Sequence, residues 1–549
     1  MRLMPLAFAC LAAFSVGAAP SRSVAQPFTA DRCAALKGLQ ISAAKIGLPT
    51  QGAEVVDAVI DEKAGSACIV SGRVRAVDPK APDIQFQVAL PGAWNGKAMM
   101  LGGGGQNGVI PVLTTNDPRL ITKVPSPFSR GYAVFGSDSG HQGSPLDGSF
   151  ALNDEAYRNW FGDALKKTRD VSMRIIRSAY GRKPERAYFI GRSTGGREAL
   201  TVASRWPADW DGVVSMYPAR NVAVASMARL AFMQALSGDA WIAPPARVQL
   251  LKAANETCDG LDGLRDGVIG NLKACRAIFD PATAKVDGQP LRCAMGATAP
   301  APCLTDKQIA LLKWADAPLP LGVKLANGED SFPGINSLTS DLGIPDISPV
   351  AAWNTLLGLG LAAPASPLSD RMPIAAAFAD SNVKYSIVGD GTSDWASFDV
   401  RNPGKYLARL NRVAALDALD TQLGAFAKRG GKVLMIHGDS DLLVSPRLTE
   451  RYYENQVATL GQQKVDAFLR FYMIPGFGHS VSSVFLADWD AAAALEAWVE
   501  RGVDPRDSLV MTDMIGKPGR TRPMCRYPAW PKYRAGDPDM AASFVCATE

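Results

Sequence analysis

The chain of 549 residues contains only three histidines, and several kinds of sequence feature are missing from it. Lysine and arginine are not gathered into runs, and the formal net charge is only +5, so nothing predicts an electrostatic track for nucleic acid or anionic lipid. Beyond the N-terminal segment no apolar run reaches about 18 residues, the length that would predict a membrane-spanning helix. No repeat or low-complexity tract is visible. With 47% hydrophobic and 20% charged residues, the composition is that of an ordinary globular protein and favours a small-molecule partner.

The N-terminus has the pattern of a secretory signal peptide. Met1-Arg2-Leu3 carries the positive charge, an apolar stretch follows to about Ala19, and Ser23-Val24-Ala25 supplies the small residues of a cleavage site. We therefore expect residues 1–25 to be removed and the mature chain to be soluble and secreted or periplasmic. A lipoprotein anchor at Cys10 is the alternative, but the residues before Cys10 lack the usual leucine and Cys10 lies too early.

Removal of the leader, which contains Cys10, leaves eight of the nine cysteines. An even number of cysteines in an exported chain predicts disulfides, with free buried thiols as the alternative for any pair. Sequence alone permits many pairings. Because the cysteines fall into neighbouring couples, the economical prediction joins Cys33 to Cys68, Cys258 to Cys275, Cys293 to Cys303, and Cys525 to Cys546.

Apolar, strand-like runs recur along the chain, and each ends in a loop of glycine or small polar residues. They span residues 97–101, 132–135, 186–190, 432–436 and 468–474, while residues 160–180 have a helical pattern. Strands that alternate with helices in this way predict a parallel sheet whose ligands bind beyond the carboxyl ends of the strands.

Residues 219–430 break this rhythm, because they hold four cysteines, many prolines and scattered aromatic residues. We interpret this stretch as a lid-like inserted domain, so that residues 26–218 and 431–549 form the two parts of one α/β core. The aromatic residues of the insert fit an ordinary small core better than a set of ligand contacts.

The pentapeptide Gly191-Arg192-Ser193-Thr194-Gly195 matches the G-x-S-x-G nucleophile elbow of α/β-hydrolases. It lies directly after a predicted strand and before the helix-forming residues 197–200, which is the context that the motif requires. The turn holds its serine in a strained conformation, and only small flanking residues fit where strand and helix approach closely. Ser193 is therefore the predicted nucleophile.

A serine hydroxyl is a poor nucleophile until a base takes its proton, and histidine is the usual base. Of the three histidines, His479 follows the last predicted strand, near the C-terminus, where this fold places its base. For His141 and His437 a structural role, in packing or hydrogen bonding, is the better interpretation.

The base needs a carboxylate that fixes its tautomer and stabilises the imidazolium. Asp441 follows the 432–436 strand and gives the chain order serine, acid, histidine that is typical of α/β-hydrolases. Asp439 is the competitor in the same loop. For the oxyanion we expect two backbone donors: the N–H of Thr194, and one from the glycine loop 102–105, where Gly105 is preferred to Gly104.

A second site is suggested by the loop Cys258–Val268, in which Asp259, Asp262 and Asp266 alternate with turn-forming glycines. Ca²⁺ prefers such oxygen ligands, supplemented by backbone carbonyls. The loop is not an EF-hand, because the spacing differs and no bidentate glutamate ends it. From the residues alone, a solvated acidic loop is as well supported as a metal site.

Taken together, these motifs resemble the tannase/feruloyl esterase family, which also includes mono(hydroxyethyl) terephthalate hydrolases. The likeness spans nearly the whole mature chain. It rests on residues 90–97, the glycine loop 102–105, Asp138-Ser139-Gly140-His141, residues 191–198, Asp209-Trp210-Asp211-Gly212, residues 258–268, Pro475-Gly476-Phe477-Gly478-His479 and residues 522–528.

The resemblance implies an α/β-hydrolase fold with a large lid that holds a structural calcium ion. It implies a secreted carboxylic ester hydrolase that acts through Ser193, His479 and Asp441 on esters of hydroxycinnamic, gallic or terephthalic type acids. The four cysteine couples match the usual pairings of the family. By position, the calcium ligands would be Asp259, Asp262, Asp266 and the carbonyls of Leu264 and Val268.

The sequence departs from the family at the triad itself. The family typically has a cysteine just before the serine and another just after the histidine, joined by a disulfide, but here these places hold Arg192 and Ser480. Residues 215–218 also depart from the small-residue stretch common in the family. We hypothesise that Arg192 replaces the covalent tie with hydrogen bonds or an ion pair near the triad loops.

Two alternatives to an aromatic-acid esterase stay open on this sequence. Nothing in the elbow reads the acyl group, so an esterase or acyltransferase for non-aromatic esters is one alternative. The other is a catalytically inactive binding protein that kept the fold.

Overall fold

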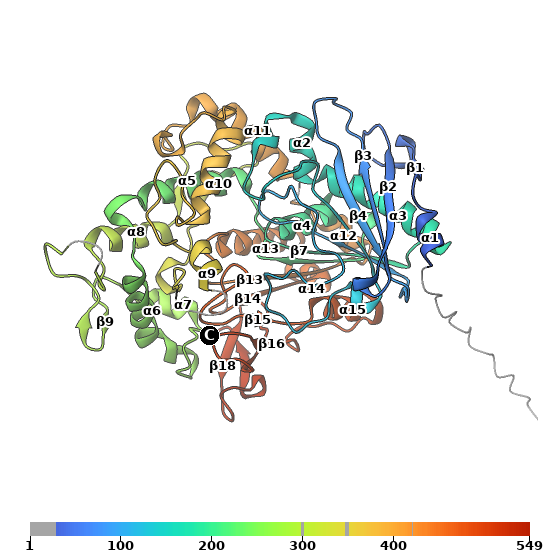
Figure 1. Cartoon of the computed structure of the whole chain (residues 1–549). Helices are drawn as coiled ribbons and strands as arrows, with labels where there is room; N and C mark the ends of the chain where they lie inside the picture. The colour runs from blue at the N-terminus through green and yellow to red at the C-terminus, as the bar shows by residue number, and fades with distance from the viewer. Residues whose placement is uncertain (1–28, 298–300, 346–350, 420) are drawn as a thin grey trace, which may run out of the picture.

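A sheet of ten strands runs through the core of the molecule (Figure 1). The computed structural model describes residues 29–297, 301–345, 351–419 and 421–549, so the predicted signal peptide lies outside the described residues. The strand order is β1-β2-β3-β4-β6-β5-β7-β8-β13-β14. The strands are β1 (Gln40–Ile41), β2 (Ala53–Asp61), β3 (Ala67–Val74), β4 (Ile84–Leu90), β5 (Lys97–Leu101), β6 (Ala133–Ser137), β7 (Arg186–Arg192), β8 (Gly212–Met216), β13 (Lys432–Gly438) and β14 (Leu469–Ile474).

The sheet has an antiparallel and a parallel half. Pairing is antiparallel from β1 to β6 and parallel from β6 through β5, β7, β8 and β13 to β14. In the parallel half the strands are buried on both faces, as β6 and β8 show along their whole length, which explains why they read as continuous apolar runs. The predicted strands are confirmed, with ends that differ from the prediction by no more than about two residues.

Helices cover both faces of this sheet. The larger core cluster lies on the face covered by α3 (Ala164–Tyr180), α4 (Thr194–Arg205), α13 (Pro446–Leu460) and α14 (Gln462–Phe468). The opposite face packs against α15 (Ala491–Arg501). The parallel strands are therefore covered on both faces, and their carboxyl ends open into loops at the same edge of the sheet.

Residues 217–431 add no strand to the large sheet in the part of them that the structure describes. They form helices and two short antiparallel strand pairs around a separate hydrophobic cluster, on one side of the sheet (Figure 1). The helices are α5 (Val222–Ala235), α6 (Pro244–Cys258), α7 (Leu272–Ile278), α8 (Asp306–Asp316), α9 (Ala351–Leu357), α10 (Ile374–Ser381), α11 (Leu407–Ala418) and α12 (Gly424–Lys428), and the short strands are β9 (Lys285–Val286), β10 (Gln289–Pro290), β11 (Leu319–Pro320) and β12 (Ser331–Phe332). We call this segment the lid.

Small elements complete both ends of the core. At the N-terminal side lie α1 (Ala30–Ala34) and, before α3, α2 (Asp154–Arg158); the C-terminal strands are β15 (Ala487–Asp488), β16 (Val510–Asp513), β17 (Thr521–Pro523), β18 (Trp530–Tyr533) and β19 (Phe544–Ala547). Among the described residues, no helix combines the length and apolar character needed to cross a membrane.

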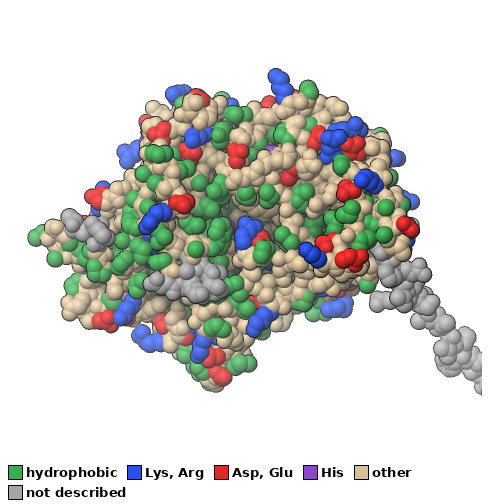
Figure 2. Space-filling view, viewed as in Figure 1, with side chains coloured by type: hydrophobic (Ala, Val, Ile, Leu, Met, Phe, Trp, Pro, Cys, Tyr) green, Lys and Arg blue, Asp and Glu red, His purple; other side chains and the backbone are tan. Residues whose placement is uncertain are grey.

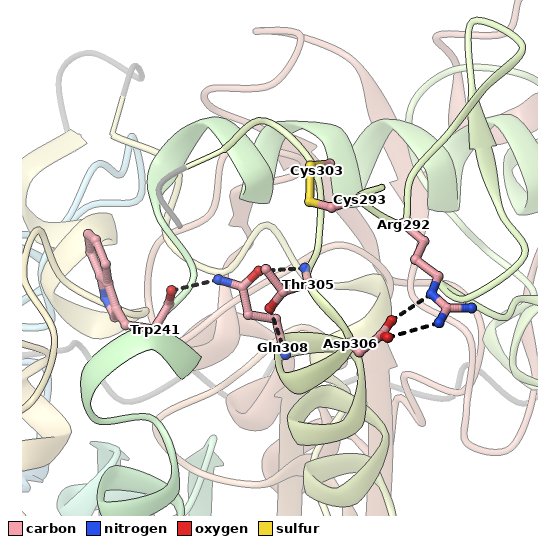
Figure 3. The surroundings of a disulfide bond; sticks show 7 residues. All are labelled: Trp241, Arg292, Cys293, Cys303, Thr305, Asp306 and Gln308. Carbon is pink, nitrogen blue, oxygen red and sulfur yellow. Dashed lines mark hydrogen bonds and ion pairs between the residues drawn. A yellow bond between two sulfur atoms is a disulfide. The ribbon is translucent and has the colours of Figure 1, made fainter. Parts of the chain in front are cut away.

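All four predicted disulfides are confirmed: Cys33–Cys68, Cys258–Cys275, Cys293–Cys303 and Cys525–Cys546. Figure 3 shows how one of them leads into a lid helix. After Cys303, Thr305 and Gln308 form a reciprocal capping box at the start of α8, and the Gln308 amide also donates to the Trp241 carbonyl at 2.8 Å. Disulfide, cap and side-chain bond together fix where α8 begins against its neighbour.

Candidate active site

Ser193 stands at the sharp turn between β7 and α4. Its backbone has φ 57° and ψ −120°, a strained conformation for a residue with a side chain. The flanking glycines are sterically required, because a Cβ on Gly191 would lie 2.0 Å from the Gly195 carbonyl oxygen, and one on Gly195 would lie 2.8 Å from that of Gly103. This close approach turns the Ser193 side chain toward the lid-side edge of the sheet.

His479 links Ser193 to Asp441. Its Nε2 lies 3.0 Å from the Ser193 Oγ, and its Nδ1 lies 2.7 Å from the Asp441 Oδ2. The three residues follow three different parallel strands, β7, β13 and β14, whose carboxyl ends meet at one edge of the sheet. The structure thus brings the predicted serine, base and acid within hydrogen-bond reach of one another.

Asp441 is fully buried and has no oxygen without a partner. Its Oδ1 accepts from the backbone N–H groups of Leu443 and Val444, both at 2.9 Å, while its Oδ2 faces two histidines. Burial opposes ionisation, yet the charge of His479 and the hydrogen bonds of His437 and His479 hold the pKa of Asp441 well below its ordinary value. The carboxylate is therefore charged and fixed in place.

Asp439, the alternative acid in this loop, makes hydrogen bonds to other groups than His479. Its Oδ1 accepts from the Ser440 hydroxyl at 2.9 Å and from the Gly476 N–H at 2.8 Å, in the loop that carries His479. Burial raises the pKa of Asp439 to about 7. Asp439 joins the acid loop to the histidine loop and makes no hydrogen bond to His479.

His437 shares the carboxylate of Asp441, a contact that the sequence reasoning missed. Its Nε2 lies 3.1 Å from the Asp441 Oδ2 and 3.0 Å from the Val444 carbonyl oxygen, and its Nδ1 lies 2.8 Å from the Thr449 hydroxyl. The expected structural role therefore takes a specific form. The signal in the sequence was the spacing of four residues between His437 and Asp441 across a tight strand-end loop.

Two backbone donors are available beside Ser193. Thr194 is the first residue of α4, and Gly105 has φ 60° in the glycine loop, where a Cβ would lie 2.5 Å from the Pro145 carbonyl oxygen. In the described part of the chain neither of these N–H groups donates to a protein acceptor. The Thr194 hydroxyl donates to the Gly105 carbonyl at 2.6 Å, which ties the two predicted oxyanion donors together.

A buried carboxylate fixes the glycine loop 102–105 through hydrogen bonds. Glu198, on α4, accepts from the Gly103 N–H at 2.9 Å and from the Asn107 side-chain amide at 2.7 Å. Burial raises the pKa of Glu198, against the charge of Arg197 and these hydrogen bonds. Helix α4, which follows Ser193, thus positions the loop that carries Gly105.

Tyr217 lies in residues 215–218, where the sequence departs from the family that it resembles. Its buried ring packs edge-on against the His479 ring with a centroid distance of 4.8 Å, and burial raises its pKa against the effect of the Arg192 charge. The Arg192 side chain is exposed and makes no hydrogen bond or ion pair with the described residues, so the hypothesis that such contacts replace the missing disulfide is wrong. The charge of Arg192 acts on Tyr217 and Asp117 without direct contact. The non-covalent support for His479 comes from Tyr217 instead.

Ser193 opens on a cavity between the sheet edge and the lid. The cavity contains about 1180 Å³ of empty space, part of it continuous with solvent, and its walls are mostly apolar. Figure 2 shows the surface hollowed near the middle of this face, with hydrophobic side chains gathered on the lid side of the hollow. Phe232, Phe378 and Trp314 of the lid line it together with Gly105 and Thr194.

In the acidic loop of the lid, the carboxylates offer oxygen atoms that could ligate a cation, and one of these atoms lacks a hydrogen bond. The Asp259 Oδ1 is buried without a hydrogen bond, and burial, followed by the charges of Asp266 and Asp259, raises the pKa of Asp262 to about 7. Asp266 forms an ion pair with Arg522. Among the described residues no three His, Cys, Asp or Glu side chains converge as a ready metal cluster. The chemistry of the donors fits a hard cation, whereas the ion pair at Asp266 takes up one of the expected ligands.

Comparisons with known proteins match the chain to one family of esterases. The model of the family "Tannase and feruloyl esterase" matches residues 68–547. An uncharacterized esterase of Agrobacterium fabrum is 38% identical over 540 residues, 94% of this chain and 93% of its own length. A mono(2-hydroxyethyl) terephthalate hydrolase of Piscinibacter sakaiensis is 30% identical over 532 residues, 87% of this chain and 84% of its own length.

Solved structures share the fold. An esterase from Aspergillus oryzae superposes with a TM-score of 0.72 at 22% identity, covering 94% of this chain and all of its own, and feruloyl esterase B from the same species gives 0.69 at 21% identity, covering 93% and 95%. The predicted α/β-hydrolase fold is confirmed.

Proposed function

Because the chain belongs to the tannase and feruloyl esterase family and is a carboxylic ester hydrolase, we propose that it cleaves esters of aromatic acids through an acyl-enzyme on Ser193. One observation carries the proposal: Ser193, at the end of the hydrogen-bonded chain with His479 and Asp441, opens on a mostly apolar cavity whose lining includes several aromatic side chains. The relatives named as feruloyl esterases and as a mono(2-hydroxyethyl) terephthalate hydrolase act on aromatic-acid esters according to their names.

The geometry supports the following sequence of steps. His479 Nε2 takes the proton of the Ser193 hydroxyl as Oγ attacks the ester carbonyl, and Asp441 stabilises the resulting imidazolium. The N–H groups of Thr194 and Gly105 donate to the oxyanion. His479 then gives its proton to the leaving alcohol, and water, activated by the same base, releases the acid from Ser193.

The first experiment asks whether Ser193 is the nucleophile. A fluorophosphonate probe should label the purified protein, and labelling should be absent in Ser193→Ala. The matched control is Ser204→Ala, which changes a serine on the same helix, α4, far from the turn. Labelling of Ser193→Ala, or no labelling of the unaltered protein, would contradict the assignment and favour an inactive binding protein.

The second experiment asks which acyl group the enzyme prefers. Feruloyl, galloyl and terephthaloyl esters are compared with acetyl and butyryl esters of the same alcohol, with kcat/KM as the readout. We expect the aromatic acids to be preferred, since Phe232, Phe378 and Trp314 line the cavity. A preference for the aliphatic esters would support the non-aromatic alternative, and transfer to an added alcohol in place of water would support an acyltransferase.

We also propose that the protein is exported and that the lid binds calcium. The four disulfides and the pattern of residues 1–25 support export, which predicts a mature N-terminus at Gln26 in a mass spectrum of the protein from its native host. The unpartnered Oδ1 of Asp259 supports a structural calcium ion, which Asp259, Asp262 and Asp266 would hold with the carbonyls of Leu264 and Val268.

Metal analysis tests the calcium proposal directly. We expect about one Ca²⁺ per chain and a melting temperature that falls on treatment with EGTA and recovers with Ca²⁺. Asp259→Asn should bind less calcium, whereas Asp287→Asn, which changes an exposed aspartate of the lid, should not. The proposal would be refuted if the protein contained no bound calcium and its melting temperature did not change on treatment with EGTA.

A further inference from the structure

A short segment of the lid, residues 336–341, contacts both loops that carry the partners of Ser193. We call these loops the acid loop, residues 439–445 between β13 and α13, and the histidine loop, residues 475–486 between β14 and β15. The contacts come from Asn336, Ser340 and Asp341, each of which is at most 6% exposed. Polar side chains buried to this degree need hydrogen bonds, and these three find partners across the boundary between lid and core.

Two of these hydrogen bonds end on the acid loop. The Asn336 side-chain amide donates to the Asp439 carbonyl at 2.7 Å, and the Ser340 hydroxyl donates to the Ser440 carbonyl at 3.1 Å. Both acceptors are backbone oxygens, and they belong to the two residues directly before Asp441. The lid segment therefore fixes the backbone from which the Asp441 side chain extends toward the base.

Asp341 binds the histidine loop. Its Oδ2 accepts from the Ser483 N–H at 2.9 Å and from the Ser483 hydroxyl at 2.5 Å. The same oxygen accepts from the Asn354 amide at 3.1 Å, and Oδ1 accepts from the Gly343 N–H at 2.9 Å. Ser483 follows His479 by four residues, so one lid carboxylate holds the loop of the base through two donors, while two donors of the lid hold the carboxylate.

The 336–341 segment is itself fixed within the lid. The Ser337 N–H and hydroxyl both donate to the Asp316 carboxylate, each at 2.6 Å. Arg247, which is completely buried, donates to the Gly343 carbonyl at 2.9 Å and to the carbonyls of residues 242, 359 and 360. Groups that position a site must themselves be held by such an outer layer of hydrogen bonds, and this segment meets that requirement.

The histidine loop needs this support, because Ser480 stands where the family typically has one of the two cysteines that join the loop to the serine turn. We propose that the 336–341 segment is a positioning element of the catalytic site, which fixes Asp441 and His479 relative to each other. Within the segment, Asp341 is the positioning residue of the histidine loop. The proposal rests on the proposed function, which gives Asp441 and His479 their roles. It makes the lid a support of the catalytic residues in addition to a wall of the cavity.

The central test is Asp341→Asn, which keeps the size of the side chain. Because both oxygens of Asp341 face donors, the new NH₂ group must point at a donor in either orientation. We expect kcat to fall roughly 10- to 100-fold with little change in KM, since Asp341 is not among the described residues that line the cavity. The matched control is Asp390→Asn, because Asp390 accepts from the N–H and the hydroxyl of Thr392 at the exposed surface of the lid. Its kinetics should equal those of the unaltered protein.

Smaller changes assign the effect to the hydrogen bonds. Ser483→Ala and Ser340→Ala each remove one hydroxyl donor between lid and core, so kcat should fall several-fold in each, and Ser483→Thr, which keeps a hydroxyl, should restore most of the loss. Combined with Asp341→Asn, Ser483→Ala should add little, because both changes remove the same contact. A kcat that is unchanged in Asp341→Asn and in Ser340→Ala, or a loss confined to KM, would overturn the proposal. If Asp341→Asn does not fold, the three serine variants decide by the same criteria.

Labelling by a fluorophosphonate probe separates positioning from a loss of folded protein. In Asp341→Asn the rate of labelling should fall in parallel with kcat, while the final extent should match that of the unaltered protein. A lower final extent at an unchanged rate would show a merely structural role and overturn the proposal. If the unaltered protein is not labelled at Ser193, the proposed function fails and this proposal fails with it. If Ser193 is labelled and Asp341→Asn keeps both the rate and kcat, the proposed function stands and the positioning role alone fails.

Discussion

Glu198 allows a sharp test of how the glycine loop is held, because its carboxyl group is buried and shared between two donors. The substitution Glu198→Gln keeps the shape of the side chain and replaces one acceptor oxygen with an NH₂ group. In the structure one oxygen lies 2.9 Å from the Gly103 nitrogen and the other 2.7 Å from the Asn107 amide nitrogen, so the new NH₂ group must face a donor on either side. One charge-assisted hydrogen bond is lost, and two donors are pressed together.

The magnitude follows from these contacts. Loss of a hydrogen bond to a charged group costs about 1.5–3 kcal/mol, and this should appear in the free energy of unfolding of Glu198→Gln. The same change loosens Gly103, two residues from Gly105, so we expect kcat to fall about tenfold, which corresponds to about 1.4 kcal/mol of transition-state stabilisation. KM should change less, since Glu198 does not line the cavity.

The assay combines urea unfolding with ester hydrolysis at pH 7 and 8, and Glu185→Gln, at a surface-exposed glutamate, is the control. Burial raises the pKa of Glu198, whereas the charge of Arg197 and the hydrogen bonds favour its ionised form, which is the form this prediction requires. A protonated carboxyl group would resemble the glutamine amide closely. Unchanged stability and kcat in Glu198→Gln would therefore refute the assignment of a charged carboxylate under the loop.

Three further predictions concern the neighbours of the triad. Since burial raises the pKa of Asp439 to about 7, its ionisation costs stability as the pH rises from about 4 through 7. Asp439→Asn should thus raise the melting temperature at pH 8 and not at pH 4. The gain in the free energy of unfolding at pH 8 should be at most about 4 kcal/mol, and equal shifts at both pH values would contradict this. Tyr217→Ala should lower kcat and cost about 3 kcal/mol in unfolding, while Tyr217→Phe, which keeps the ring against His479, should retain most of the activity; equal losses in both would contradict the packing role. His437→Gln should lower kcat several-fold with little change in KM in steady-state kinetics, because one of the groups that orient Asp441 is weakened, and an unaltered kcat would show that the backbone N–H groups suffice.

Much of the core could be predicted because its strands are buried on both faces. Residues 97–101 and 432–436 are apolar runs that end in glycine or small polar residues, and only a parallel strand in a covered sheet needs such a pattern. The elbow could be predicted for a steric reason, since Gly191 and Gly195 leave no room for a Cβ. The pairing of cysteines was predictable because each couple closes a short segment of chain.

Contacts between loops that are distant in the sequence could not be predicted in the same way. The packing of Tyr217 on His479 depends on how the end of β8 meets the loop after β14, and no local pattern encodes that distance. The hypothesis of hydrogen bonds or an ion pair at Arg192 was wrong because an exposed arginine keeps its hydration and needs no partner.

The place of the lid in the chain has a consequence for biosynthesis. β8 ends at Met216 and β13 begins at Lys432, yet these strands are neighbours in the sheet, so the whole lid must be synthesised before β13 can pair. Until then the turn at Ser193 exists without Asp441 and His479 beside it, and closing so long a loop is slow compared with forming local structure. The proposed mechanism needs all three residues, and two of them follow the last strands of the sheet, β13 and β14. Under that mechanism, hydrolytic activity reports that the sheet is fully assembled.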